Sequence, residues 1–282
     1  MARADFNLLL IDVGAMLSII APTTLLLAWC VWRYRRASGR GTYMPKWSHS
    51  LPIEIVSWGF PAAIVVFLGY YSYRGTFAVD PFGPGVLAHG RSAYADTPAV
   101  DVDVVTTDWQ WLFIYPKLHI AAANELVIPV HTPVHFRLTS STVTNDFFIP
   151  QLAGEIDIMP GMRTKQSLLA DHLGTYAGFS ADFSGPGFSW MRFQTHVVTP
   201  AAFQAWTAKA AQAPVHLTMA SFNRFARPTI NIHGRTGTFS DVADGFFDNI
   251  VREVDRGTLF TTPRAMTDKS TYTTGNGVEP TH

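Results

Sequence analysis

The sequence predicts a membrane protein that combines a hairpin of two transmembrane helices with an all-β domain and a few short C-terminal helices. Two long segments, Val13–Trp32 and Ile55–Tyr73, carry no charged side chain. Between residues 100 and 199, short runs of β-branched and aromatic residues recur between turn residues. The chain of 282 residues is 48% hydrophobic, with a mean hydropathy of +0.12. That is high for a wholly soluble chain, so we expect the apolar excess to be local.

The two apolar segments are long enough to cross a bilayer. They contain 20 and 19 residues, which at helical rise cover about 30 Å of hydrocarbon. We expect a hairpin over residues 1–78, with spans over about 8–32 and 54–73. The joining loop, residues 33–53, carries five basic and no acidic residues, a bias typical of the cytoplasmic side. The N-terminus and the C-terminal domain would then lie in the periplasm, outside a bacterial inner membrane.

A linker and a β domain are expected after the hairpin. Residues 79–99 begin Asp80-Pro-Phe-Gly-Pro-Gly and continue with small and polar residues, which favours a linker. The domain should occupy residues 100–199, because seven or so strand-like runs recur there with prolines at or beyond their ends. These runs are Val100–Tyr115, Glu125–Pro129, Val134–Ser140, Asp146–Pro150, Arg163–Leu169, Tyr176–Phe183 and Arg192–Val198.

Helical spacing replaces the strand pattern after Pro200. Phe203, Trp206 and Ala210 recur at intervals of three and four residues, which predicts a short helix. Residues 221–225 and 241–254 suggest two more, so we expect a helical extension over 200–260. The last stretch, 261–282, is polar and rich in Thr, which favours a flexible tail. The net charge of zero gives no electrostatic basis for binding nucleic acid.

Three motifs carry a resemblance to a known family. They are Ser180-Ala-Asp-Phe-Ser184-Gly-Pro-Gly-Phe188-Ser-Trp-Met191, Val143-Thr-Asn145-Asp-Phe-Phe-Ile-Pro150 and Asp108-Trp109-Gln-Trp111. With the hairpin before them, residues 8–210 resemble subunit II of the haem-copper respiratory oxidases. The resemblance implies that the β domain is a cupredoxin-like Greek-key barrel in the periplasm.

In the cytochrome c oxidase branch of that family, the barrel holds a binuclear copper centre. Its ligand positions fall here on Asn145, Ser180, Asp182, Ser184, Phe188 and Met191. Only the methionine matches a ligand. Copper of this kind needs thiolates and imidazoles, and a serine hydroxyl stays protonated near pH 7 and binds it poorly. We therefore expect no metal in this chain and a role for Met191 in core packing.

This pattern, in which most of the copper ligands are absent, resembles the quinol oxidase branch of the cytochrome bo type. The resemblance implies a non-redox subunit of an oxidase that oxidises ubiquinol, reduces oxygen to water and translocates protons. Haems and copper B would lie in partner subunit I, with small subunits III and IV and membrane lipid as further partners. This chain would serve structure and assembly. The alternative is a free-standing, membrane-tethered periplasmic binding or oxidase-assembly protein, which would expose clusters of Met, His or Cys ligands.

Glu54 is a candidate residue for proton uptake. It begins the second span, where an acid in the first helical turn is also favoured by the helix dipole alone. However, Trp47-Ser-His-Ser together with Glu54, Trp58 and Pro61 resembles the family's pattern at the start of its second helix. That resemblance implies a glutamate at the mouth of the K-type proton pathway of subunit I.

Trp109 and Trp111 are candidates for core packing or for an interface with the large subunit. They are two residues apart in a strand-like run. Alternate residues of a strand point to the same face, so we expect the two indoles to lie side by side.

Overall fold

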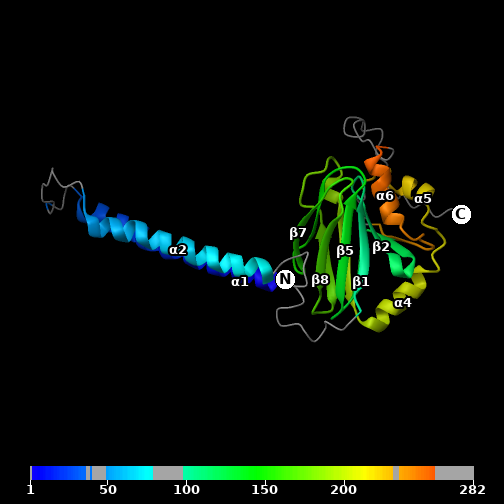
Figure 1. Cartoon of the computed structure of the whole chain (residues 1–282), viewed down its shortest axis with the longest axis horizontal. Helices are drawn as coiled ribbons and strands as arrows, with labels where there is room; N and C mark the ends of the chain where they lie inside the picture. Colours follow the sequence, from blue (N-terminus) through cyan, green and yellow to red (C-terminus); the bar gives the residue numbers. More distant parts are fainter. Residues whose placement is uncertain (1, 36–38, 40–48, 79–97, 231–234, 258–282) are drawn as a thin grey trace. The chain divides into compact units, whose positions relative to one another are not determined.

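The structure is a computed structural model that describes residues 2–35, 39, 49–78, 98–230 and 235–257. It divides into two compact parts, a helical hairpin and a β-rich domain, and each is described here by itself (Figure 1). Trp47, most of the loop 33–53, most of the linker 79–99 and the tail 261–282 lie outside the described residues.

The hairpin consists of α1 (Ala2–Arg33) and α2 (Leu51–Ala78). Phe6–Arg33 and Leu51–Gly75 are long and apolar enough to cross a membrane. The hydroxyl of Thr23 donates to the carbonyl of Ile19 one turn earlier, which satisfies a polar group without water. Large apolar side chains point outward along both helices; Trp58, for example, is 78% exposed. Such surfaces require lipid or other apolar helices as their environment.

Eleven strands form two sheets in the described part of the domain. They are β1 (Val100–Thr106), β2 (Trp111–Tyr115), β3 (Ile120–Ala123), β4 (Glu125–Pro129), β5 (Pro133–Ser140), β6 (Asn145–Ile149), β7 (Ala153–Ile158), β8 (Thr164–Leu169), β9 (Gly174–Phe179), β10 (Arg192–Val198) and β11 (Gly237–Phe239). One sheet has the order β11-β3-β2-β1-β5-β8 and the other β4-β10-β9-β6-β7. The pairs β1–β5 and β4–β10 are parallel and the other ladders antiparallel. This arrangement confirms the all-β domain.

Several strands differ from those expected. The run Val100–Tyr115 is two strands, because residues 107–110 form a turn in which Trp109 has a φ of 70°. The expectation that Trp109 and Trp111 share one strand was therefore wrong. Strands β3, β7 and β11 were not expected at all. The first is mostly alanine, which has a low strand propensity. The second contains Gly154 and two acidic residues, which are depleted in strands. The third has only three residues, too few to give a strand pattern.

An aromatic cluster fills the space between the sheets. The ring of Phe193 lies 4.8 Å from Trp111, 5.0 Å from Phe113 and 5.5 Å from Phe147, measured between centroids. All four side chains are buried, and aromatic pairs at such distances contribute about 0.5–1.5 kcal/mol each beyond their buried area. Gly178 on β9 makes room for this packing, because a Cβ there would lie 2.1 Å from the ring of Phe193.

The C-terminal extension adds α4 (Pro200–Ala210), α5 (Met219–Phe225) and α6 (Phe246–Asp255). The first two helices begin at side-chain caps, in which Thr199 accepts from the amide of Ala202 and Thr218 forms a capping box with Ser221. The third begins five residues later than the expected 241–254, because Asp241 has a left-handed backbone at the start of that range.

Helix α6 covers the outer face of the six-stranded sheet. Its apolar stripe, Phe246, Phe247, Ile250 and Val251, is buried against residues of β1, β2 and β3, with α5 alongside (Figure 1). Burial of an aromatic or branched aliphatic side chain contributes roughly 1.5–3 kcal/mol. The extension is therefore part of the folded domain and not an appendage to it.

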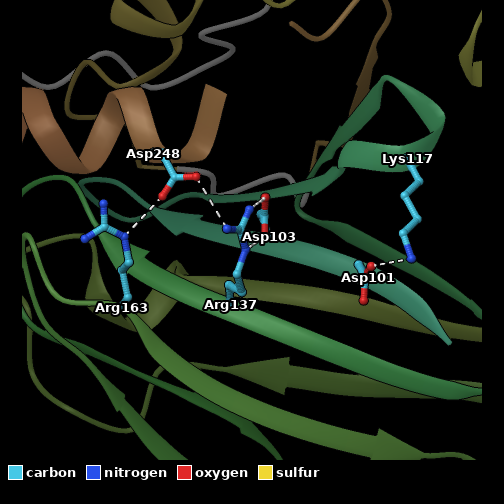
Figure 2. A network of polar contacts seen from close by, with 6 residues as sticks. All are labelled: Asp101, Asp103, Lys117, Arg137, Arg163 and Asp248. Atoms are coloured by element: carbon cyan, nitrogen blue, oxygen red, sulfur yellow. Dashed lines mark hydrogen bonds and ion pairs between the residues drawn. The ribbon is translucent and has the colours of Figure 1, made fainter. Parts of the chain in front are cut away.

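A network of ion pairs links α6 to the same sheet (Figure 2). Arg137 on β5 donates from Nε and Nη2 to the two carboxylate oxygens of Asp103 on β1, both at 2.6 Å. Its Nη1 reaches Asp248 at 3.4 Å, and Arg163 donates to the other oxygen of Asp248 at 3.1 Å. The guanidinium also lies 4.8 Å from the ring centroid of Phe247. Burial raises the pKa of Asp103, and the bidentate contact with Arg137 opposes that effect.

Candidate functional site

Four of the six positions that correspond to copper ligands converge in the fold. Asn145 begins β6, Ser180 follows β9, and Ser184 and Met191 bound the loop that leads to β10. All four are buried, each at most 4% exposed. The other two positions, Asp182 and Phe188, are exposed and partly exposed. The resemblance thus identified a real cluster of side chains, although only part of its ligand set lies inside it.

Hydrogen bonds within the protein occupy the polar groups of this cluster. The Oγ of Ser180 accepts from the amide of Asp146 at 3.1 Å and lies within donating distance of the Oδ1 of Asn145, at 3.4 Å. The Nδ2 of Asn145 donates to Oγ1 of Thr106 at 3.2 Å and to the carbonyl of Val143 at 3.0 Å. The side chains therefore satisfy one another, as buried polar groups must.

The second half of the cluster is held by two indoles. Trp109 donates from Nε1 to the carbonyl of Ser184 at 3.0 Å, and Trp111 donates to the carbonyl of Met191 at 3.4 Å. The hydroxyl of Ser184 in turn reaches the Sδ of Met191 at 3.9 Å. Met191 is fully buried in the main core cluster, in keeping with the packing role expected for it.

The tryptophans pack in the core. Trp109 is 1% exposed and Trp111 is fully buried. Of the two roles considered, a direct contact with a partner subunit does not fit this burial, because neither indole reaches the surface of the chain. Trp109 instead supports the loop, since a Cβ on Gly187 would lie 2.2 Å from its ring.

The cluster does not fit the binuclear copper centre that the cytochrome c oxidase branch of the resembled family holds. Its donors are an amide, two hydroxyls and a thioether, and a binuclear copper site requires thiolates and imidazoles. The amide and one hydroxyl are also engaged in the hydrogen bonds given above. Within the part of the chain that the structure describes, no three His, Cys, Asp or Glu side chains gather in a metal-binding arrangement.

A carboxyl pair adjoins the cluster and was missed by sequence reasoning. Asp146 on β6 lies directly opposite Asp157 on β7 and is only 5% exposed. Burial, a hydrogen bond with Asp157 and repulsion from Glu155, Asp157 and Asp182 raise the pKa of Asp146 to about 7. The pair could not be found without β7, which places the second carboxylate.

Glu54 lies in the first turn of α2, as expected. Its Oε1 is 2.5 Å from Nδ1 of His49, and the two side chains are 48% and 63% exposed. The amide of Glu54 donates to the carbonyl of Ser50 at 3.0 Å. Sequence reasoning named the glutamate but not this histidine partner.

Comparisons with known proteins identify relatives of this chain. The family described as "Cytochrome C oxidase subunit II, periplasmic domain" matches residues 92–198. "Cytochrome bo(3) ubiquinol oxidase subunit 2" of Pseudomonas putida is 41% identical over 225 residues, which cover 80% of this chain and 69% of that one. "Ubiquinol oxidase subunit 2" of Acetobacter aceti is 39% identical over 257 residues, covering 91% and 78%.

A solved structure is also similar. The periplasmic domain of subunit II of cytochrome oxidase from Bradyrhizobium japonicum has 21% identity and a TM-score of 0.38, covering 39% of this chain and 91% of that one. From the identity and coverage shared with the two curated relatives, the chain belongs to the family of ubiquinol oxidase subunit 2.

Proposed function

We propose that this chain is a non-redox subunit of a proton-translocating ubiquinol oxidase in a bacterial inner membrane. One observation carries the non-redox role: the positions of the copper ligands hold Asn145, Ser180 and Ser184, whose polar groups make contacts inside the protein. A chain that relays electrons through this domain would need a metal there. The name of the Pseudomonas putida relative supplies the donor class, ubiquinol.

The hairpin would anchor the domain on the periplasmic side and pack against a haem-bearing partner subunit. Its outward apolar side chains need such neighbours, and the basic flank after α1 favours a cytoplasmic loop. Ubiquinol is apolar and would be oxidised within the membrane. Haems and copper B would reside in that partner, with small subunits III and IV alongside. This chain would then support the assembly of the complex and cover its periplasmic side.

Glu54 would serve at a proton entrance on the cytoplasmic side. Its half-exposed carboxylate and the nearby, more exposed ring of His49 are both accessible to water. General acid–base transfer requires a titratable group within hydrogen-bond reach of its partner, and 2.5 Å satisfies that condition. No metal is needed for this role.

Purification from native membranes in mild detergent tests the proposal. We expect a tagged form of this chain to bring down a haem-bearing subunit with ubiquinol-dependent oxygen consumption. The optical spectrum should show haems and lack the band of a binuclear copper centre. Recovery of the chain alone would instead favour the tethered binding or assembly protein. Oxidation of cytochrome c together with that copper band would also contradict the proposal.

A further inference from the structure

A cavity lies between the second half of α4, the start of β4 and strand β11. Its volume is about 310 Å³, at the lower end of the range of about 300–1,000 Å³ that is usual for small-molecule sites. Three distant parts of the chain line it, with the residues Glu125, Trp206, Lys209, Ala210, Thr236 and Thr238. These residues lie outside both the hairpin and the polar cluster at the copper positions. The proposed function therefore makes no use of this cavity.

One wall of the cavity is an aromatic ring that the core fixes in place. Trp206 is partly buried and packs against the main core cluster. Its ring lies 5.2 Å from that of Tyr115 and 6.0 Å from that of Phe203, measured between centroids. Tyr115 is fully buried, and its hydroxyl donates to the carbonyl of Val127 at 2.8 Å. The indole thus offers a rigid apolar surface, so a ligand that packs on it does not have to order it first.

A carboxylate is held at the same cavity. Glu125 begins β4, and its Oε1 lies 3.5 Å from Nε2 of His196 on β10. The other ring nitrogen, Nδ1, lies 3.0 Å from Oγ1 of Thr175 on β9. With the proton on Nε2, the imidazole donates toward Glu125 and accepts from Thr175, so both ring nitrogens have partners. The cavity therefore contains a hydrogen-bond acceptor whose position is set before any ligand arrives.

The remaining polar groups of the cavity are available to a ligand. Within the part of the chain that the structure describes, no hydrogen bond or ion pair engages the indole nitrogen of Trp206, the ammonium of Lys209 or the hydroxyls of Thr236 and Thr238. An ammonium and an indole N–H donate, a hydroxyl both donates and accepts, and a carboxylate accepts. The cavity thus combines several donors and acceptors with one aromatic wall.

This combination favours a neutral ligand with many hydroxyl groups. Lys209 and Glu125 carry opposite charges, so a simple anion or cation is attracted by one and repelled by the other. A zwitterion would pair with both, but Lys209 is exposed, and ion pairs that are open to water contribute little. A sugar ring has hydroxyls that donate and accept, and its apolar C–H face suits an aromatic wall. The chemistry of the cavity therefore matches a saccharide best.

We propose that this cavity binds a saccharide, with the C–H face of a sugar ring on Trp206 and its hydroxyls hydrogen-bonded to Glu125, Lys209 and the two threonines. The proposal goes beyond the proposed function and does not depend on it, because the cavity is built within the β-rich part of the chain alone. Free sugars and the glycans of the cell envelope share this chemistry.

Saturation-transfer NMR on the full chain tests the proposal, with N-acetylglucosamine and maltose as probes. The chain is kept in a polyoxyethylene detergent, because the headgroup of a maltoside detergent is itself a saccharide. We expect saturable binding of at least one sugar with a Kd of about 1 mM, as the usual affinity per atom of small ligands gives. Absence of saturable binding by both sugars overturns the proposal. Saturable binding of L-phenylalanine or inorganic phosphate in place of the sugars overturns it as well.

Substitutions assign the binding to the cavity. Trp206→Ala should weaken it by at least about tenfold, because the aromatic wall supplies most of the apolar contact. Thr238→Val removes a hydroxyl at nearly constant shape, leaves the core intact and should weaken binding by roughly two- to tenfold. The control is Trp190→Ala, which removes a tryptophan that is 46% exposed outside the cavity and should bind as the wild type does. Near-ultraviolet circular dichroism checks the fold of each variant. Unchanged binding by folded Trp206→Ala and Thr238→Val proteins overturns the assignment.

Cosedimentation with isolated peptidoglycan separates the two sources of saccharide. Retention of the wild type together with loss of retention by Trp206→Ala and Thr238→Val identifies an envelope glycan as the ligand. Binding of the free sugars without retention identifies a soluble saccharide. Retention that is equal in the wild type and both variants, without binding of either free sugar, overturns the proposal.

Discussion

The carboxyl pair beside the polar cluster makes the stability of the domain depend on pH. Burial and neighbouring carboxylates raise the pKa of Asp146 from 3.8 to about 7. Between these values the folded domain keeps a proton that the unfolded chain has lost. Its stability should therefore fall as the pH rises from about 4 to about 7 and should be independent of this group above that range.

The size of the effect follows from the same pKa difference. Each pKa unit corresponds to 1.36 kcal/mol, so the shift from 3.8 to about 7 amounts to about 4 kcal/mol over the whole range. Roughly 2 kcal/mol of this falls between pH 5 and 7. For a domain of this size, 1 kcal/mol lowers the Tm by about 2–4 °C. The Tm should thus drop by roughly 5–10 °C between pH 5 and pH 8.

Thermal unfolding of the full chain in detergent, followed by near-ultraviolet circular dichroism, measures this slope. Asp146→Asn should remove the part of the slope that comes from Asp146, because the amide does not titrate. The part that comes from Asp103, whose pKa is also raised by burial, should remain. Asp157→Asn should reduce the part that comes from Asp146 without removing it, because burial, the largest cause of the shift, remains. Asp244→Asn is the control, since that side chain is 90% exposed. A wild-type profile parallel to that of Asp146→Asn would refute the reasoning.

Two further substitutions test the core and the proton entrance. Gly178→Ala should lower the free energy of unfolding by about 3 kcal/mol through overpacking, since the added Cβ would lie 2.1 Å from the ring of Phe193. Gly154→Ala is the control, because its added Cβ meets nothing within 4 Å. Equal Tm values for the two variants would contradict the packing argument. Glu54→Gln should slow oxidase turnover and proton uptake in the purified complex by roughly a hundredfold, the low end of what general acid–base groups contribute, whereas unchanged rates would exclude a shuttle role.

The hairpin and the general fold class could be predicted because their signals are local. A run of 20 residues without charge needs no knowledge of its neighbours to indicate a span. One strand that escaped prediction derives half of its pairing from a distant segment. Strand β3, Ile120–Ala123, is mostly alanine and is held between β2 and β11, the latter more than a hundred residues later in the chain.

The candidate site, too, could be predicted from the sequence only in part. Resemblance placed Asn145 and Ser180 among the copper positions, and the fold brings them together. Their bonding could not be predicted, because one hydrogen-bond partner of Asn145, Thr106, is 39 residues away. Trp109 was wrongly predicted to lie in a strand together with Trp111. Its left-handed backbone lies in the turn between β1 and β2, and a bulky residue in that conformation is uncommon enough that sequence rules do not anticipate it.

The covering of the six-stranded sheet by α6 bears on how the domain matures. Arg137 and Asp248 are 111 residues apart in sequence, so the outer face of β1 and β2 stays uncovered during synthesis until α6 has been made. Contacts between such distant segments form slowly, and an open apolar sheet is prone to misassociation in the meantime. Truncation before residue 246 should therefore lower the yield and the solubility of the newly made domain.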